Sequence, residues 1–276
     1  MPYFDRVGSF GRDQWAFRKK HSCRDLVAQL ICKWLLALDT GCKIGIYLSD
    51  ISRAFDRVDR EILAEDLRQN GISDSMLRFL YSYLAPREAA VVVQGHNSDV
   101  FTIQDEVFQG TVLGPPLWNV LFKGIDDTVR QCLFRVAKFA DDLTAYRNYR
   151  SPTSNDQIQE DLRECQQACH LWGVQRRVSF DASKEHFCIL HKVQCSGDSF
   201  RLLGVMVDTK LTMEEEIRRI RRKARPKIQA ILNTRAYYDT TGLLQQYKAH
   251  VLCLLEQSSV SIYHAAQSHL DALARL

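Results

Sequence analysis

The sequence predicts an α+β domain followed by an all-helical region. Through the central part of the chain, apolar residues at helical spacing alternate with short β-prone runs, whereas only the helical pattern continues after Met213. This order of patterns is typical of a mixed domain joined to a helical one. The 276 residues, of which 46% are apolar and 25% charged, suffice for one large domain or two modest ones with a real core.

The individual elements follow from these patterns in chain order. Residues 22–38 are expected to form an amphipathic helix with Ser22 as its N-cap, ended by Gly41. We further expect a β-run at 43–51, helices at 58–71 and 73–85, paired strands at 89–95 and 99–107, a helix at 116–132, two strands or a bent hairpin at 133–148, a helix at 154–173, a hairpin at 177–191 and a strand at 199–208. Glycine or proline marks several of these boundaries.

Charge and cysteine usage narrow the class of protein. The net charge of +4 is too mild to prove a nucleic-acid partner, but residues 218–227 hold seven basic residues and no acid. That run is either a phosphate-facing helix or a solvated charged face. The nine cysteines form no Cys-x-x-Cys pair, and without a signal peptide they favour a reduced intracellular compartment, nucleus or cytoplasm. No apolar run reaches the ~18 residues of a membrane span.

Three pieces of sequence carry candidate chemistry. In "IYLSDISRAFDRV", Asp50 closes a β-run, and its other interpretation is a helix cap. In "VFQGTVLGPPLW", Gly110 and Gly114 permit unusual backbone angles or a close ligand, and the alternative is a plain loop-to-helix connection. In "KFADDL", Asp141 and Asp142 are adjacent in an apolar run, and a solvated turn is the alternative.

One distant aspartate and an adjacent pair form a donor set for hard cations. Carboxylate oxygens select Mg²⁺ or Mn²⁺. Such a set can hold two ions ~3.5–4 Å apart, which is the arrangement used for in-line displacement at phosphorus.

In this order the three pieces resemble the palm motifs of reverse transcriptases, above all those of non-LTR (LINE-type) retrotransposons. Further segments are similar to that family: "QWAFR" from Gln14, "LWGVQRRVSFDASKE", the primer-grip-like "FRLLGVMVD" and the thumb-like C-terminal helices. The resemblance implies a right-hand polymerase palm, an antiparallel sheet backed by helices, with partial fingers at 1–45, the palm at 46–211 with a fingers insertion at about 60–105, and a helical thumb or connection at 212–276.

The resemblance assigns the metal site and the reaction. Asp50 and Asp141 would hold two Mg²⁺ ions, with Mn²⁺ as an alternative, and Asp142 would support them. The Ile51 backbone carbonyl would complete the coordination shell of one of these ions. Lys184 would act as a proton donor to pyrophosphate, with a solvated lysine as the alternative. The implied function is RNA-directed DNA synthesis on an RNA template, in which dNTPs are added to the 3′-hydroxyl of a DNA primer.

The resemblance also assigns contacts with nucleotide and nucleic acid. Phe55 would exclude a 2′-hydroxyl, or else is a core aromatic. Gln109 and Gly110 would contact the nucleotide, and Arg18 and Lys19 would reach phosphates, or else are a surface pair. The primer and template contacts would be Gly114, Leu203, Gly204, Arg218, Arg222 and Lys223. Gly204 in a strand can also mark a bulge.

Departures from the family pattern keep other interpretations open. Ala16, Glu106, Phe108, Asp181 and Glu185 stand where Gly, Gly, Pro, Asn and Thr are usual, and Ser49 stands where an apolar residue is common. Only thirteen residues precede Gln14, which favours a truncated core. The alternatives are a catalytically silent remnant that only binds nucleic acid, a group II intron or retron enzyme, and, more remotely, an unrelated two-metal phosphohydrolase. The sequence does not indicate the oligomeric state.

Overall fold

The computed structural model describes residues 2–6, 8–103 and 107–276. The chain forms two compact units. Unit 1 comprises 1–21, 46–147 and 159–187, and unit 2 comprises 22–45, 148–158 and 188–276. Within the described residues no helix is long and apolar enough to cross a membrane.

The central sheet has four strands in the order β6-β7-β1-β8. Their bounds are Arg135–Phe139 (β6), Asp142–Tyr149 (β7), Lys43–Ser49 (β1) and His186–Leu190 (β8). Strand β1 is buried along nearly its whole length, which explains why its sequence is apolar without alternation. Strands β6 and β7 form an antiparallel hairpin whose innermost pair is Phe139 and Asp142, as the expected hairpin at 133–148 requires.

The helices of unit 1 surround a buried aromatic core. After the short helix α1 (Pro2–Arg6), the 3₁₀ turn η1 (Ala54–Arg57) follows β1, and then come α3 (Arg60–Gln69), α4 (Asp74–Tyr83), α5 (Gly114–Phe122), α6 (Ile125–Gln131) and α7 (Asn155–Arg176). Helix α5 is buried on almost every side, including Trp118 and Phe122. It packs against α3 and η1, and α6 packs against β6. A fully buried helix next to the sheet therefore sets the position of the loops around it.

Two expected helix boundaries are wrong. The helix expected at 116–132 is two helices, α5 and α6, separated at Lys123 and Gly124. A Cβ on Gly124 would lie 3.0 Å from Arg176 Nη2 and 3.2 Å from Trp172 Nε1, so the chain bends where α7 packs closely. Helix α7 does not stop at Gly173 but continues to Arg176. A Cβ on Gly173 would lie 2.8 Å from the Val178 carbonyl oxygen, so this glycine serves close packing.

Two expected β elements also differ from the structure. The hairpin expected at 177–191 has only β8 as a strand, because Phe180 bridges Ile51 after β1 instead. The paired strands expected at 89–95 and 99–107 form two short ladders. Arg87–Ala89 (β2) pairs with Phe101–Ile103 (β5), and Val92–Val93 (β3) pairs with His96–Asn97 (β4). Gln94 and Gly95, both at positive φ, make the turn between β3 and β4. Residues 104–106, including Glu106, lie outside the described part of the chain.

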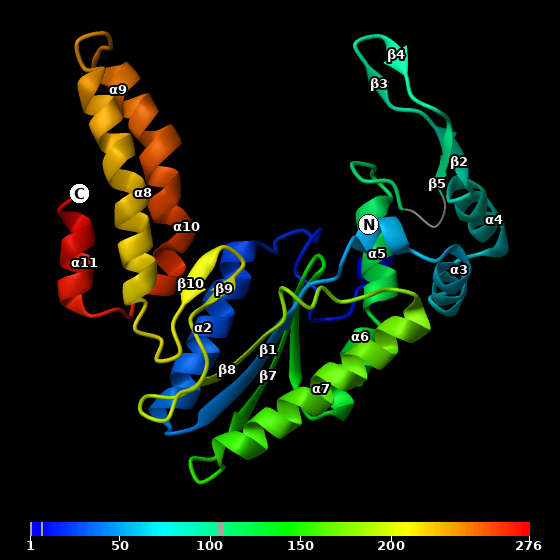
Figure 1. Ribbon diagram of the computed structural model, residues 1–276, viewed down its shortest axis with the longest axis horizontal. Helices are drawn as coiled ribbons and strands as arrows, with labels where there is room; N and C mark the ends of the chain where they lie inside the picture. Colours follow the sequence, from blue (N-terminus) through cyan, green and yellow to red (C-terminus); the bar gives the residue numbers. More distant parts are fainter. Residues whose placement is uncertain (1, 7, 104–106) are drawn as a thin grey trace. The chain divides into compact units, whose positions relative to one another are not determined.

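Unit 2 combines one long helix, a small hairpin and a helical bundle. Helix α2 (Cys23–Asp39) has Ser22 as its N-cap, as predicted. The strand expected at 199–208 is a hairpin of Phe200–Leu202 (β9) and Val205–Val207 (β10). The bundle contains α8 (Glu214–Asn233), α9 (Thr240–Tyr247), a π-helical turn (Lys248–Leu252), α10 (Cys253–Ile262) and α11 (Gln267–Ala274). Helix α10 packs against both α2 and α8 (Figure 1).

Candidate active site

Three aspartates lie where β1 ends and the neighbouring strand β7 begins. Asp50 directly follows β1, Asp141 is the second residue of the β6–β7 loop, and Asp142 opens β7. Strands β1 and β7 are adjacent in the sheet. The Asp50 side chain is only 13% exposed, Asp141 is half-buried and Asp142 is exposed. The fold therefore brings together the three carboxylates that the sequence singles out.

These carboxylates repel one another in a partly desolvated environment. Desolvation raises the pKa of Asp141, and the charge and hydrogen bonding of Asp50 raise it further. Desolvation by nearby protein atoms, followed by the charges of Asp141 and Asp50, raises the pKa of Asp142 to about 6, although this residue keeps an exposed side. A cation among the three would relieve the repulsion and lower these pKa values.

Lys184 is a cation that the chain itself supplies to this cluster. Its ammonium contacts the Asp50 carboxylate and lies 3.7 Å from the Asp181 carboxylate. The hydrogen bond and charge of Asp50 raise the pKa of Lys184. The loop is shaped by Asp181, whose carboxylate accepts hydrogen bonds from the Ser183 amide and hydroxyl at 3.1 and 2.6 Å. In this arrangement Lys184 neutralises the carboxylate closest to it.

Glu185, another departure from the family pattern, lies between the turn that carries Lys184 and the start of β8 at His186. Its carboxylate accepts hydrogen bonds from the Tyr47 hydroxyl at 2.5 Å and from Gln166 at 2.7 Å. His170 Nε2 lies 2.7 Å from the same carboxylate. Glu185 is therefore a buried and fully partnered acid, and its neighbours explain how the chain accommodates it.

The donor set fits a hard divalent cation by its chemistry. In the described ranges, no three His, Cys, Asp or Glu side chains already stand as a metal cage. The fit comes instead from three carboxylates at the adjoining ends of β1 and β7, two of which have pKa values raised first by desolvation and then by the neighbouring carboxylates. Near them, the bridge between Ile51 and Phe180 uses the Asp50 carbonyl and the Ser52 amide for its two hydrogen bonds. Neither bond uses the Ile51 carbonyl.

Phe55 lies in η1 beside helix α5. Its half-buried ring stacks on Trp118 with ring centroids 5.9 Å apart. A Cβ on Gly114 would lie 3.3 Å from the Phe55 ring and 3.1 Å from the Phe108 carbonyl oxygen. Gly114 therefore has a packing reason to be glycine, besides any contact with template or primer.

Gln109 and Gly110 lie on the exposed loop before α5. The Gln109 amide donates a hydrogen bond to the Asp56 carboxylate at 3.1 Å. Gly110 has φ +79°, and no atom of the described residues lies within 4 Å of where its Cβ would be. Glycine therefore serves the backbone conformation at this position. Both residues face solvent and are open to a ligand.

The two basic candidates near the N-terminus, Arg18 and Lys19, differ in their surroundings. The Arg18 guanidinium donates to the carbonyls of Gly11 and Gln14 at 3.0 and 3.1 Å, whereas Lys19 is exposed. The neighbouring Ala16 is buried, and its φ is not among the positive values. Alanine is therefore accommodated where the family usually has glycine.

The remaining candidates belong to unit 2. Leu203 and Gly204, at φ +47° and +91°, form the β9–β10 turn rather than part of one strand. A Cβ on Gly204 would lie 3.2 Å from Gln257 Nε2. On α8, Arg218 pairs with Glu214 at 2.5 Å, while Arg222 and Lys223 are exposed.

Sequence reasoning missed two side chains that touch the carboxylate loop, Gln14 and Trp118. Each hydrogen-bonds to the backbone of Ala140, the residue before Asp141. The family-like segment beginning at Gln14 was a signal for the first of them. The second is hidden in an apolar helix, where an aromatic residue indicates only packing.

Comparison with known proteins identifies the family. Residues 4–207 match the reverse transcriptase (RNA-dependent DNA polymerase) family, and the chain therefore belongs to that family. It is 25% identical to the RNA-directed DNA polymerase from mobile element jockey of Drosophila funebris, over 94% of this chain and 30% of that protein. It is 24% identical to the probable RNA-directed DNA polymerase from transposon X-element of Drosophila melanogaster, over 85% of this chain and 27% of that protein.

These relatives place the chain with polymerases of non-LTR retrotransposons, as its motifs indicate. The chain spans less than a third of the length of these two relatives. Among solved structures, telomerase from Candida tropicalis in complex with a TWJ fragment of telomeric RNA aligns with a TM-score of 0.58 and 11% identity, over 95% of this chain and 46% of that one. Apo telomerase from the same organism, truncated from its C-terminal domain, gives a TM-score of 0.54 and 13% identity, over 75% of this chain and 42% of that one. The fold is therefore the right-hand polymerase fold that the sequence predicts.

Proposed function

We propose that this chain is the core of an RNA-directed DNA polymerase that adds dNTPs to a primer 3′-hydroxyl on an RNA template. One observation carries the proposal: Asp50, Asp141 and Asp142 converge beside the junction of β1 and β7 in a chain of the reverse transcriptase family. The RNA-bound telomerase with the same fold supports an RNA partner. The fingers at 1–45, palm at 46–211 and thumb at 212–276 belong to this proposal.

The mechanism follows from the positions of the chain's own groups. Asp50 and Asp141 would hold two Mg²⁺ ions, with Asp142 and the Ile51 carbonyl in support. When bound, these ions supply activation of the attacking hydroxyl and neutralisation of the phosphate charge. The primer 3′-hydroxyl would release its proton to solvent, and its oxygen would form a bond to the α-phosphorus as the bond to pyrophosphate breaks.

Other residues select and orient the nucleotide. The Phe55 ring, held by Trp118 and Gly114, would lie under the sugar and exclude a 2′-hydroxyl by steric contact. Gln109 and Gly110 present exposed groups to the incoming nucleotide. Lys184, whose ammonium contacts the Asp50 carboxylate, would donate a proton to the leaving pyrophosphate. On α8, Arg222 and Lys223 would track the duplex backbone.

A primer-extension assay on an RNA template tests this function. The purified chain should incorporate dNTPs in the presence of Mg²⁺, and Asp141→Asn should abolish incorporation. The matched control is Asp127→Asn on α6, which removes a carboxylate that is 83% exposed and outside the cluster. Full activity in Asp141→Asn would show that the assigned role is wrong. Binding of primer and template without any incorporation by the wild type would favour the silent remnant instead.

A further inference from the structure

The loop that carries Asp141 contains a backbone conformation that needs support. Ala140 is the first residue of the two-residue loop between β6 and β7, and its φ is +58°. Glycine is the usual residue at a loop position with positive φ. For an L-residue with a Cβ the left-handed region costs roughly 1–2 kcal/mol. Such a conformation persists only where surrounding contacts hold it.

The Gln14 side chain holds both polar groups of this residue. Gln14 Oε1 accepts a hydrogen bond from the Ala140 amide at 3.0 Å, and Gln14 Nε2 donates one to the Ala140 carbonyl at 3.0 Å. The same Oε1 also accepts from the Ala16 amide at 3.0 Å. Gln14 is fully buried, so water does not replace it. One amide side chain thus satisfies both backbone groups of Ala140.

Trp118 gives the same carbonyl a second donor. Its Nε1 donates to the Ala140 carbonyl at 3.1 Å. The buried indole stacks on the rings of Phe55 and Phe122, whose centroids lie 5.9 and 5.3 Å from its own. The position of Trp118 is therefore set by packing. It also links the loop before Asp141 to the ring proposed to screen the sugar.

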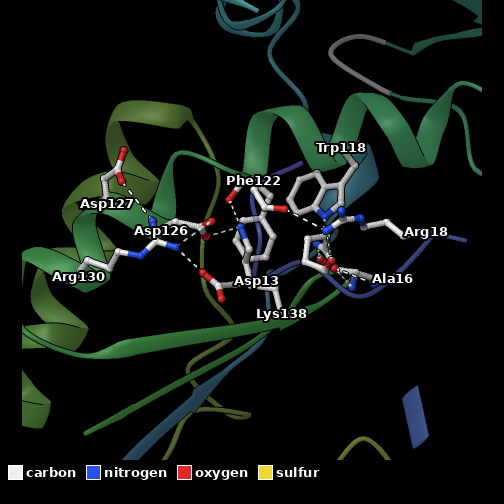
Figure 2. Close-up of polar contacts among 12 residues, drawn as sticks. Asp13, Ala16, Arg18, Trp118, Phe122, Asp126, Asp127, Arg130 and Lys138 are labelled. Carbon is white, nitrogen blue, oxygen red and sulfur yellow. Dashed lines mark hydrogen bonds and ion pairs between the residues drawn. The ribbon is translucent and has the colours of Figure 1, made fainter. Parts of the chain in front are cut away.

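The segment that carries Gln14 is itself fixed against β6. The Lys138 amide donates to the Asp13 carbonyl at 2.8 Å, and the Trp15 amide donates to the Lys138 carbonyl at 2.9 Å. The fully buried Lys138 ammonium contacts the Asp126 carboxylate and donates to the Phe122 carbonyl at 3.0 Å (Figure 2). Removing one partner of such a buried pair lowers the free energy of unfolding by ~3–5 kcal/mol. Gln14 is therefore held in a fixed register beside Ala140.

We infer that Gln14 and Trp118 are positioning residues that hold the Ala140 peptide in its left-handed conformation and so aim Asp141 and Asp142 at Asp50. This inference rests on the proposed function only in that the aligned carboxylates bind divalent ions. Because Asp141 follows Ala140 directly, a change in the Ala140 dihedral angles redirects both carboxylates. Loss of either contact should therefore weaken ion binding more than it weakens nucleic-acid binding.

Two substitutions separate this role from packing. Gln14→Met keeps the length of the side chain and removes its hydrogen bonds. Trp118→Phe removes the indole donor and keeps a stacked aromatic ring. The matched control is Trp172→Phe, because among the residues that the structure describes the buried Trp172 Nε1 has no hydrogen-bond partner. Ala140→Gly provides a second test, because glycine adopts a positive φ without strain.

Mn²⁺ binding, followed by electron paramagnetic resonance of the free ion, gives a readout independent of activity. Gln14→Met and Trp118→Phe should raise the Mn²⁺ Kd by about 10- to 100-fold and lower kcat by a similar factor, with less than about a 3-fold change in the Kd for primer and template. Trp172→Phe should match the wild type. The loss caused by Gln14→Met should be smaller in the Ala140→Gly background.

Several outcomes would overturn this inference or separate it from the proposed function. Folded Gln14→Met and Trp118→Phe variants that bind Mn²⁺ like the wild type would overturn it. So would additive effects of Gln14→Met and Ala140→Gly. If Gln14→Met does not fold, Mn²⁺ binding by Trp118→Phe alone decides. A wild type that binds Mn²⁺ but incorporates no dNTP would refute the proposed function, while the same Kd series would still test the positioning role.

Discussion

The Lys184 ammonium contacts the Asp50 carboxylate, although 134 residues separate the two in the sequence. The contact places a positive charge next to three acids that otherwise repel one another. Lys184 lowers the pKa of both Asp141 and Asp142, against the larger effects that raise them. The lysine thus partly compensates, within the chain, for the charge that a divalent ion would bring.

Removing that charge should raise the pKa of Asp142 above its value of about 6. We expect this in Lys184→Met, because the remaining neighbours of Asp142 are Asp141 and Asp50, both of which disfavour its ionised form. Carboxyl ¹³C NMR titration measures the change. Lys192→Met is the control, since Lys192 is 58% exposed, nearly as much as Lys184 at 59%, and pairs with Asp39 instead. An unchanged Asp142 titration in Lys184→Met would contradict the expectation.

Stability without metal should fall as the pH rises through the carboxylate cluster. The pKa of Asp142 is about 6 in the folded chain, above an unfolded value near 3.9. The contribution of Asp142 to folding stability is therefore fully present below about pH 4 and is lost as the pH rises through 6. The free energy of unfolding of Asp142→Asn, measured relative to that of the wild type, should increase by about 1 kcal/mol between pH 4 and pH 7, after allowance for solvent screening.

Urea unfolding at several pH values in a chelating buffer checks this expectation. Asp127→Asn, outside the cluster, should show no such pH-dependent gain. Saturating Mg²⁺ should reverse the difference, because an ion that binds the complete carboxylate set stabilises the wild type most. A gain for Asp142→Asn that is equal at pH 4 and pH 7 would rule out the cluster as its cause.

Phe55→Ala should admit ribonucleotides. The substitution removes the half-buried ring that Trp118 and Gly114 hold in place, and a 2′-hydroxyl would then have space. Selectivity, measured as the ratio of kcat/KM for dNTP and rNTP, should fall by at least about 10-fold, which corresponds to ~1.4 kcal/mol. Phe79→Ala on α4, where Phe79 is 57% exposed, is the control. Unchanged selectivity would leave Phe55 as a core aromatic.

Arg222 and Lys223 should contribute to nucleic-acid binding through charge alone. Both are exposed on α8, whereas Arg219 pairs with the buried Glu216 at 2.6 Å. The double variant Arg222→Gln/Lys223→Gln should reduce the magnitude of the slope of log K against log salt by ~1.4–1.8, since each neutralised phosphate contributes ~0.7–0.9. Arg219→Gln should instead lower Tm with little effect on the slope. Equal slopes for the wild type and the double variant would argue for a solvated face.

Several elements show where sequence patterns are sufficient and where they fail. Helix α2 and its Ser22 cap were predictable because periodicity and capping are local properties. The β9–β10 hairpin was not predictable, because "FRLLGVMV" is mostly apolar on both sides of its turn. Leu203 also adopts a positive φ, which a leucine in the sequence does not indicate. Gly173 was interpreted as a helix end, yet it is glycine because Val178 approaches it from later in the chain.

The sequence by itself determined the family, the three candidate carboxylates and the mixed fold with its helical end. Each of these depends on residue types at short spacing or on motifs in order. Only the tertiary structure decided that Lys184 neutralises Asp50, that Trp118 touches the Ala140 carbonyl, and that Gln14 holds a residue 126 positions away. These contacts join distant segments through buried hydrogen bonds and charge, and such pairings have no local periodicity by which a sequence could indicate them.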